Sequence, residues 1–459
     1  MIPASGSPHG LIVAAPSSGS GKTVFTLGLL RHLARSGIAV ASAKVGPDYL
    51  DPAFHEAATG QVCLNLDTWA MRGRTVTAGV HHLSRMAPLV VAEGVMGLFD
   101  GAVGVAETIA DGSTASLARV TGWPVVLVVD VRGQAASAAA VVRGFATHST
   151  GVVIAGVVFN RVGGPRHEAV LRQACAAHSP ELPILGCLPA GGELALPSRH
   201  LGLVQAREHP ALERFLDTAA ETIATHVDIP TLLALTRQTR EGGEDGSGEH
   251  TLQPLPPLGQ RIAVARDDAF AFSYPAVLEG WRAQGAAVTL FSPLAGQPPP
   301  SESDAVYLPG GYPELHAGRL AGNEDFLRGL RAAAARGAAV YGECGGYMVL
   351  GRALIDAEGV RHALAGLLPV VTSFSNRRLH LGYRDAVVTT SGPLGVAGTR
   401  YRGHEFHYAT LVAEETETGS PLFAITDAMG TSLGRIGHVA GSVVFLQFFT
   451  EISQKKYLQ

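Results

Sequence analysis

The hydrophobic pattern of the first half of the chain alternates short apolar runs with segments of helical periodicity. The strand-like runs are residues 11–13, 39–44, 88–93, 124–130, 152–160 and 184–188. Helix-like segments such as 114–121, 135–147 and 230–236 lie between or after them. The runs are continuously apolar rather than alternating, which is typical of parallel strands covered by helices on both faces. The pattern predicts an α/β fold with a doubly wound, mostly parallel sheet, whose ligands bind at the carboxyl ends of the strands.

A segment without apolar periodicity interrupts this pattern at residues 237–259. It is charged at first, then rich in Gly and Ser, then rich in Pro, which is the composition of a linker. A new strand-like run follows at 261–265. The sequence therefore predicts a first domain at 1–236, a linker at 237–259 and a second α/β domain at 260–459.

Composition limits the possible partners. The chain has 459 residues, 46% of them hydrophobic and 16% charged, which indicates a globular protein of roughly two to three domains. Lys and Arg total 35 against 39 Asp and Glu, so no basic excess points to nucleic acid or an anionic membrane. The apolar runs are too short to span a membrane, no signal peptide is evident, and the cysteines form no CxxC pair. We expect a cytoplasmic protein without nucleic-acid or membrane partners, and leave a homodimer open.

The stretch 11–30 has the pattern of a phosphate-binding loop. An apolar strand leads into a turn of small residues, and Lys-Thr then opens an apolar-periodic helix. Glycines let backbone N–H groups close around an anion, and the helix N-terminus adds its positive end. The residues expected to bind the nucleotide are Gly19, Ser20, Gly21, Lys22 and Thr23, with Lys22 on the phosphates and Thr23 on Mg²⁺. Pro16 departs from the pattern G-x-x-x-x-G-K-[ST], and an ordinary Gly/Ser turn is the weaker alternative.

Further polar residues follow other predicted strands. Lys44, Asp48 and Asp51 come after one strand, and Glu93 and Asp100 after another. Carboxylates beside a triphosphate are suited to bind Mg²⁺, which prefers oxygen ligands. Helix capping or solvent exposure explains any single carboxylate about as well, but four of them together favour a site. Asn160 ends a third strand and is suited to bind a base edge, although a plain Asx turn explains it equally.

The second domain shows a different chemistry around Cys344. The run Gly342-Glu343-Cys344-Gly345-Gly346 lies at a strand-to-helix turn and resembles a nucleophile elbow with sulfur in place of oxygen. We expect the helix N-terminus to lower the pKa of this thiol. An earlier strand end, 307–314, contains two glycines whose N–H groups are suited to an oxyanion hole. The other cysteines, Cys63, Cys175 and Cys187, are interpreted as packing residues.

Eight motifs together resemble the cobyrinic acid a,c-diamide synthase family, including its counterpart that acts on hydrogenobyrinic acid. They are APSSGSGKT, KVGPDYLDPAFH, AEGVMGLFDG, LPSRHLGLVQA, IAVARDDAF, YLPGGYPE, YGECGGYM and YRGHEFHY. The resemblance covers nearly the whole chain. It implies a dethiobiotin-synthetase-like ATPase domain fused to a class I glutamine amidotransferase domain. It also implies amidation of the a and c carboxylates of cobyrinate or hydrogenobyrinate in cobalamin biosynthesis, with ATP, Mg²⁺ and either L-glutamine or ammonia.

The resemblance also implies roles for single residues. Cys344 matches the nucleophile that releases ammonia from glutamine. The first domain would phosphorylate a substrate carboxylate, and ammonia would displace the phosphate. Thr23, Asp48 and Glu93 are expected to bind the metal; Lys44, Asp48, Asp51 and Asp100 are expected to bind the corrinoid substrate.

One position departs from the family. The family has a histidine near the C-terminus that activates the cysteine, and Phe445 stands where we expect it. Either this chain has a changed terminus, or His404, His407 or His438 takes over, since a thiol without a base is a weaker nucleophile near neutral pH.

Three alternative functions remain open. A partition-type ATPase would share the phosphate loop, but such proteins carry a second lysine early in the loop and lack the cysteine elbow. Cobyric acid synthase shares both domain types and amidates later carboxylates. A binding protein with an inactive amidotransferase domain would explain Phe445.

Overall fold

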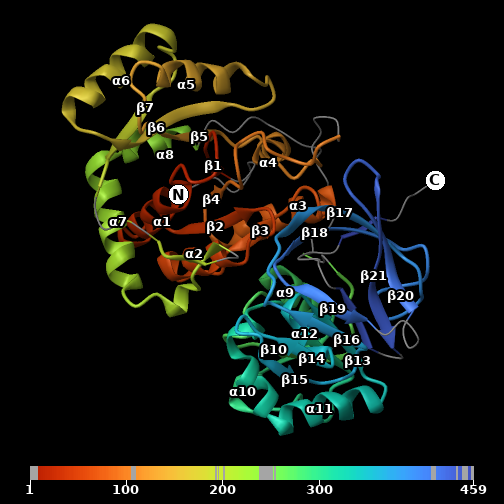
Figure 1. The fold of residues 1–459 in the computed structure, drawn as a ribbon. Coiled ribbons are helices and arrows are strands. Elements are labelled where there is room, and N and C mark those ends of the chain that lie inside the picture. Colours follow the sequence, from red (N-terminus) through yellow and green to blue (C-terminus); the bar gives the residue numbers. More distant parts are fainter. Residues whose placement is uncertain are drawn as a thin grey trace. The chain divides into compact units, whose positions relative to one another are not determined.

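The chain divides into two compact units in the computed structural model. The first comprises Met1–Trp69 and Gly73–His250, the second Ala70–Arg72 and Thr251–Gln459. The structure describes residues 9–104, 110–191, 194, 196–199, 202–236, 252, 255–414, 420–440, 443–446 and 453–455 (Figure 1). Apart from residue 252 and residues 255–259, the predicted linker lies outside the described residues, and its bounds stay a prediction.

A seven-stranded parallel sheet forms the centre of the first unit. Its strands, in sheet order, are β3 (Leu64–Leu66), β2 (Val40–Val45), β4 (Leu89–Glu93), β1 (His9–Ala14), β5 (Val125–Asp130), β6 (Ile154–Val162) and β7 (Ile184–Pro189). All neighbouring pairs are parallel. The predicted doubly wound parallel sheet is confirmed, and the short strand β3 is one that the sequence analysis did not predict.

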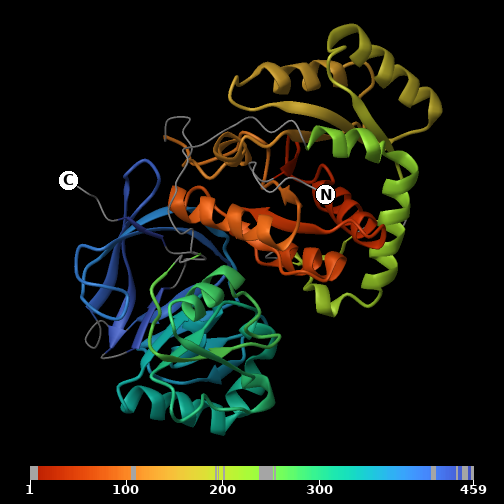
Figure 2. The same ribbon diagram turned by 180° about the vertical axis from the view of Figure 1, so that it is seen from behind.

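Helices cover both faces of this sheet, because the strands bury apolar side chains on both. Between the strands run α1 (Lys22–Arg35), α2 (Leu50–Thr59), α3 (Gly73–Met86), α4 (Thr114–Thr121), α5 (Ala138–Thr147) and α6 (Pro165–His178). The hairpin of β8 (Ser198–Arg199) and β9 (Gly202–Leu203), then α7 (Leu212–His226) and α8 (Ile229–Leu235), follow. Helices α1, α2, α7 and α8 share one core with the sheet, whereas α3 packs against β2, β3 and β4 and contacts α4. Helix α7 runs beside α1 in both views (Figures 1 and 2).

The strand order places three predicted site segments next to one another. Strands β2, β4 and β1 are adjacent, and the chain leaves each of them at the same edge of the sheet because all three are parallel. The phosphate loop follows β1, the segment 46–49 follows β2, and the segment 94–101 follows β4. The sheet therefore brings together segments that lie up to several dozen residues apart in the sequence.

The second unit has a sheet of two kinds. Its ten strands, in sheet order, are β11 (Ala287–Phe291), β10 (Arg261–Ala265), β12 (Ala305–Leu308), β13 (Ala339–Glu343), β22 (Val443–Leu446), β21 (Ser432–Ala440), β20 (Ser420–Thr426), β17 (His380–Val388), β18 (Arg400–His407) and β23 (Ser453–Lys455). The first five are parallel, and from β22 to β23 each neighbour is antiparallel. The predicted second α/β domain is confirmed; the antiparallel extension was not predicted.

Helices and a smaller sheet complete the second unit. The helices are α9 (Pro275–Ala283), α10 (Ala317–Gly322), α11 (Glu324–Ala335) and α12 (Gly345–Leu350). The smaller sheet contains β15 (Arg361–Ala363), β14 (Ala353–Ile355), β16 (Val370–Ser373) and β19 (Thr410–Glu414). Phe326 and Leu330 of α11 and Tyr347 of α12 lie in one core with strands β12 and β13.

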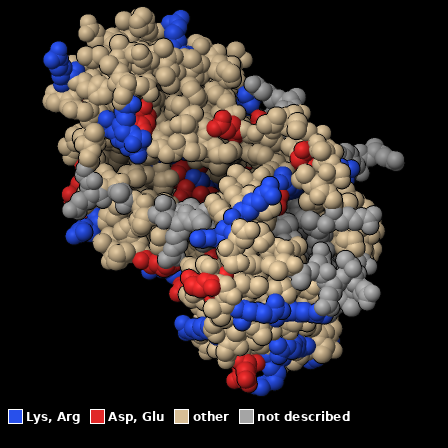
Figure 3. All heavy atoms as spheres, viewed as in Figure 1, with Lys and Arg blue, Asp and Glu red and all other residues tan. Residues whose placement is uncertain are grey.

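The surface carries charges of both signs. On the face shown in Figure 3, the described Lys and Arg side chains are interspersed with Asp and Glu. Within the described part of the chain, no helix is long and apolar enough to cross a membrane.

The packing of α1 on α7 predicts a cost for any side chain at Gly28. A Cβ built there would lie 2.7 Å from both the Ala219 carbonyl oxygen and Ile223 Cγ1 of α7. We expect Gly28→Ala to destabilise the protein by about 1–3 kcal/mol, because the two helices must move apart. Gly144 of α5 has nothing within 4 Å of such a Cβ, so Gly144→Ala is the matched control. Urea unfolding should show the control unchanged or up to about 1 kcal/mol more stable; equal effects of the two substitutions would contradict the packing argument.

Candidate functional site

The phosphate loop depends on glycines in left-handed backbone conformations. Gly19 has a φ of 75° and Gly21 a φ of 96°, which L side chains rarely adopt. A Cβ at Gly21 would lie 2.1 Å from Asn160 Nδ2. Asn160 Nδ2 instead donates to the Ser20 carbonyl at 2.8 Å. In this structure Asn160 therefore supports the loop backbone from β6, and its expected contact with a base stays a prediction.

Lys22, the first residue of α1, points along the loop. Its Nζ donates to the carbonyl of Ser17 at 3.3 Å and to that of Met96 at 2.6 Å. Met96 has a φ of 47°, which is unusual for a residue with a side chain. The Met96 carbonyl thus accepts from Lys22 in a strained backbone conformation. Burial, together with the nearby Lys44 ammonium, lowers the pKa of Lys22 to about 8. An anion beside Lys22 would offset that burial.

Glu93 is the centre of the site. It ends β4 and is fully buried. Its Oε1 accepts hydrogen bonds from Thr23 Oγ1 at 2.6 Å and Lys44 Nζ at 3.0 Å. Its Oε2 lies 2.8 Å from His55 Nε2. Burial alone would raise its pKa, but Lys44 and His55 outweigh burial and hold the pKa of Glu93 well below its ordinary value. The carboxylate is therefore charged, and it joins the phosphate loop, β2 and α2.

Lys44 lies between two carboxylates. Its Nζ contacts Asp51 Oδ2 at 2.5 Å as well as Glu93, and all three side chains are buried. Burial by itself would lower the pKa of Lys44, but the two carboxylates outweigh burial and raise that pKa above its ordinary value. Burial and the neighbouring Asp48 raise the pKa of Asp51 to about 7. The two partners of Lys44 thus differ: Glu93 is held charged, and Asp51 titrates near neutral pH.

The other two predicted carboxylates lie in the adjoining turns. Asp48 Oδ1 accepts from the backbone N–H groups of Leu50 and Asp51, at 2.7 and 3.2 Å, at the start of α2. Asp100 is exposed, and its Oδ2 accepts from the Gly97 N–H at 2.8 Å. Asp51 lies in the first turn of α2 rather than in a loop. The structure thus brings Lys22, Thr23, Lys44, Asp51 and Glu93 together and places Asp48 and Asp100 in hydrogen-bonded turns beside them.

His55 was missed by the sequence analysis. It lies four residues after Asp51 on α2, so both side chains share one face of the helix. The His55 side chain is fully buried between Glu93 and Cys63. The Sγ atom of Cys63 lies 3.4 Å from His55 Nδ1. Burial disfavours the imidazolium, but Cys63 and Glu93 outweigh it and raise the pKa of His55 to about 10. The spacing D-x-x-x-H in a motif already singled out was the available signal.

Cys344 forms a strained turn between β13 and α12. Its φ is 48° and its ψ −109°, a conformation that few residues with a side chain adopt. Glycines make the turn possible, because a Cβ at Gly346 would lie 2.0 Å from the Leu308 carbonyl oxygen. The backbone N–H groups of Gly345 and Gly311 hydrogen-bond to the thiol. Of the two glycines expected at 307–314 to line an oxyanion hole, Gly311 thus has its N–H group beside the sulfur; the second donor, Gly345 of the elbow itself, was not predicted.

The expectation of a lowered thiol pKa was wrong for this structure. Burial, with the carboxylates of Glu314 and Glu343, raises the pKa of Cys344 to about 12, and the two N–H groups lower it by less. Glu343 itself is buried and accepts hydrogen bonds from the hydroxyls of Tyr307 and Tyr341. Burial raises the pKa of Glu343 to about 8. A thiol in these surroundings needs a base to react.

Position 445 lies on the strand next to the elbow strand. Strand β22 pairs with β13, and Phe445 is in register with Gly342; the Phe445 side chain lies outside the described residues. His438 of β21 is in register with Phe445, and its side chain is likewise outside the described residues. His404 and His407 lie on β18, separated from β13 in the sheet order by β22, β21, β20 and β17. A role for any of these histidines stays a prediction.

Two family models match the chain, one in each unit. Residues 11–204 match the CobQ/CobB/MinD/ParA nucleotide binding domain, and residues 261–446 match the CobB/CobQ-like glutamine amidotransferase domain. The expected α/β phosphate-loop domain followed by a glutamine amidotransferase-like domain is thereby confirmed. The chain thus contains a nucleotide-binding domain.

Curated relatives match over nearly their whole length. The hydrogenobyrinate a,c-diamide synthase of Brucella abortus is 50% identical over 448 residues, which cover 96% of this chain and 99% of the relative. The synthase of the same name from Rhizobium meliloti is 49% identical over 451 residues, covering 96% and 100%. That from Rhodobacter capsulatus is 50% identical over 436 residues, covering 95% and 97%.

The raised pKa of His55 predicts a pH-dependent contribution to stability. A group whose pKa rises from 6.5 to about 10 on folding stabilises the protein fully below pH 6.5, and this stabilisation is lost as the pH rises through 10. We expect His55→Gln to lower the free energy of unfolding most at pH 6. The gap to the wild type should shrink by up to about 1.4 kcal/mol per pH unit toward pH 10.

Urea titrations from pH 6 to 10 measure this gap. His226→Gln is the matched control, because His226 is an exposed histidine of the same unit, at the end of α7. A gap between wild type and His55→Gln that does not change with pH would contradict the protonated His55–Glu93 pair.

Proposed function

The chain belongs to the family of hydrogenobyrinate a,c-diamide synthases, and from that premise we propose that it amidates the a and c carboxylates of hydrogenobyrinate in cobalamin biosynthesis. Glutamine or ammonia supplies the nitrogen and ATP drives the reaction through an acyl phosphate. The observation that carries the proposal is the near full-length identity to synthases of that name, which includes both domains. It favours this function over the cobyric acid synthase and partition-type ATPase alternatives.

The first unit would activate the carboxylate. An oxygen of the substrate carboxylate takes the γ-phosphoryl group of ATP, and ADP leaves; ammonia then attacks the carbonyl carbon, and phosphate leaves with the electrons of the broken C–O bond. A carboxylate is a poor electrophile, and the phosphoryl group gives it a leaving group. The loop N–H groups and Lys22 would neutralise the phosphate charge.

The oxygen donors around Glu93 fit a magnesium ion. Thr23 Oγ1 and Glu93 Oε1 already lie 2.6 Å apart, and Asp48 is in the adjoining turn. Mg²⁺ prefers such hard oxygen ligands and, when bound, supplies positive charge to the phosphate oxygens. We propose Thr23, Asp48 and Glu93 as its protein ligands.

The remaining polar residues would position the substrate. Lys44 is charged and can pair with an incoming carboxylate. Asp51 titrates near pH 7 and can be protonated beside that carboxylate, which reduces repulsion. Asp100 is exposed at the end of the β4 loop. We propose Lys44, Asp48, Asp51 and Asp100 as the residues that face the corrinoid, while the nucleotide is bound by Gly19, Ser20, Gly21, Lys22, Thr23 and Asn160.

The second unit would release ammonia from L-glutamine. The sulfur of Cys344 attacks the carboxamide carbon, and the N–H groups of Gly345 and Gly311 stabilise the oxyanion. Ammonia leaves after taking a proton, and water hydrolyses the thioester to glutamate. The raised pKa of Cys344 and the presence of Phe445 favour a weak glutaminase. A homodimer and a cytoplasmic location stay predictions.

Incubation with each corrinoid tests the substrate assignment. The purified protein is supplied with ATP, Mg²⁺, glutamine or an ammonium salt, and either hydrogenobyrinate or cobyrinate. Mass spectrometry counts the amides gained, and we expect two on hydrogenobyrinate. No amide on either corrinoid with either nitrogen donor would overturn the proposed function.

Lys22→Ala should abolish amidation with glutamine and with ammonium alike. The side chain faces the expected phosphate site, and we expect a rate loss of at least about 10²-fold. Burial disfavours the charged ammonium of Lys22, so its removal should not destabilise the fold, and the melting temperature should not fall. Coupled ADP assays and thermal unfolding measure both quantities. Full activity in this variant would contradict the assignment of the phosphate loop.

Cys344→Ser should lose glutamine-dependent amidation and keep the ammonium-dependent reaction. Ammonia needs no glutaminase, and the serine hydroxyl is a poorer nucleophile than the thiol. Cys175→Ser, on α6 of the first unit, is the matched control and should keep both reactions. Equal loss with both donors would mean that Cys344 holds the fold together, and unchanged glutamine use would refute its role. The same assay on Phe445→His shows whether a histidine there raises glutamine use.

A further inference from the structure

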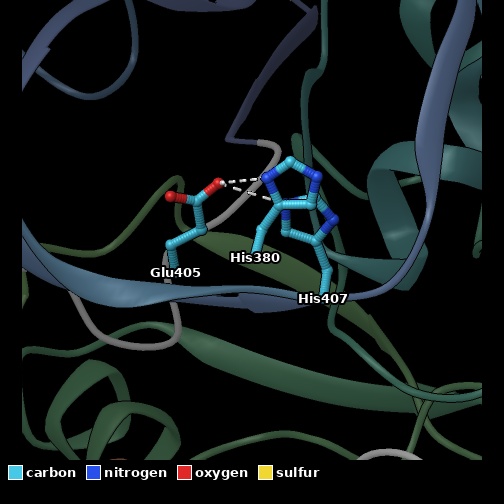
Figure 4. Close-up of side chains that lie close together, drawn as sticks. All are labelled: His380, Glu405 and His407. Carbon is cyan, nitrogen blue, oxygen red and sulfur yellow. Dashed lines mark hydrogen bonds and ion pairs between the residues drawn. The ribbon is translucent and has the colours of Figure 1, made fainter. Parts of the chain in front are cut away.

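A cluster of side chains of the types that bind metals lies on the hairpin of β17 and β18. None of these residues belongs to the phosphate loop or to the cysteine elbow. The cluster consists of His380, Glu405 and His407, and one ligand atom of each lies within 4.8 Å of the others. Figure 4 shows the two imidazole rings turned toward the same carboxylate. The three side chains converge from two neighbouring strands.

Strand register explains this convergence. Glu405 and His407 are two residues apart on β18, so they share one face of the strand. His380 of β17 is directly opposite His407. The two imidazole rings are stacked, with their centroids 4.5 Å apart and an interplanar angle of 4°. Gly382 is opposite Glu405 and leaves room above it. The Arg384 guanidinium fills that room, since a Cβ at Gly382 would lie 2.3 Å from Arg384 Nη1.

Hydrogen bonds orient the ligand atoms. His407 Nδ1 donates to the Ala409 carbonyl oxygen at 2.9 Å, and Nε2 donates to Glu405 Oε1 at 3.1 Å, because both oxygens can only accept. A metal ion at Nε2 would therefore replace the proton that Nε2 carries in this structure. His380 Nδ1 lies 3.9 Å from the same oxygen. Arg384 Nε donates to the other oxygen, Oε2, at 2.7 Å. Metal ligands in proteins are commonly held in this way, with imidazole donating to a backbone carbonyl and carboxylate accepting from a neighbour.

We propose that His380 Nδ1, His407 Nε2 and Glu405 Oε1 bind a divalent transition-metal ion of the zinc type. Two imidazoles and one carboxylate suit Zn²⁺ and disfavour Mg²⁺, which prefers oxygen alone. With bonds of about 2.0–2.1 Å, tetrahedral ligands lie about 3.3 Å apart, and the two distances to Glu405 Oε1, 3.1 and 3.9 Å, are close to that separation. Because the two imidazole rings are parallel, one of them must also rotate so that both nitrogens point at the ion. His380 has a side chain that is 36% exposed, so water can complete the coordination.

The proposed ion would join the two strands. Its ligands come from both β17 and β18, so binding to the folded hairpin stabilises it by an amount that rises with the logarithm of the free metal concentration. Arg384 keeps Glu405 to one ligating oxygen, and its positive charge weakens the attraction for a cation. This site does not depend on the proposed synthase activity, because the metal is detected directly.

The test uses the full-length protein stripped of metal by a chelator and titrated with Co²⁺ and then Zn²⁺ in excess Mg²⁺, which occupies the oxygen ligands of the first unit. We expect one Co²⁺ per chain, with visible absorption bands that Zn²⁺ abolishes. His380→Asn and Glu405→Gln should each weaken binding about 10–100-fold. His362→Asn is the matched control, because His362 pairs with Asp356 elsewhere in the same unit.

Two results would overturn the proposal. One is the absence of cobalt bands and of zinc binding in the wild-type protein. The other is equal affinity in the wild type, His380→Asn and Glu405→Gln, which would make the cluster a network of ion pairs and locate the metal elsewhere. Melting temperatures with chelator present show that each variant is folded, and those with Zn²⁺ should rise for the wild type and the control alone.

Discussion

The buried charge of Glu93 is the constraint on which the first unit depends. A carboxylate removed from water costs several kcal/mol unless other groups compensate it. Thr23, Lys44 and His55 supply that compensation from α1, β2 and α2. Removal of any one of them leaves part of a buried charge unsatisfied. The phosphate loop, the second strand and the second helix are therefore held in register by one side chain.

The same constraint gives the two carboxylates beside Lys44 different pKa values. Glu93 receives two charged partners and stays ionised, whereas Asp51 shares Lys44 and lies near Asp48, so its pKa rises to about 7. A permanently charged carboxylate is suited to a metal, and one that titrates near neutral pH is suited to a position beside another carboxylate. These properties support the different roles proposed for the two residues.

In the second unit the constraint is backbone strain rather than charge. Cys344 keeps a positive φ because glycines at 342 and 346 let neighbouring backbone come close. The turn directs two N–H groups at the sulfur, a geometry suited to stabilise an oxyanion, but burial and the neighbouring carboxylates of Glu314 and Glu343 raise the pKa of the thiol. Backbone geometry places the donors, and burial sets the protonation of the thiol.

The sequence by itself determined the local elements: the apolar runs, the phosphate loop at 15–23, the cysteine elbow and a segment without apolar periodicity at 237–259. These features depend on neighbours within a few residues, through periodicity and turn conformation. Only the tertiary structure decided that β2, β4 and β1 are adjacent, that His55 pairs with Glu93, and that the sheet of the second unit continues with antiparallel strands. It also raised the pKa of Cys344, against expectation. Strand order, burial and partner choice join residues far apart in the chain, and no local pattern encodes them.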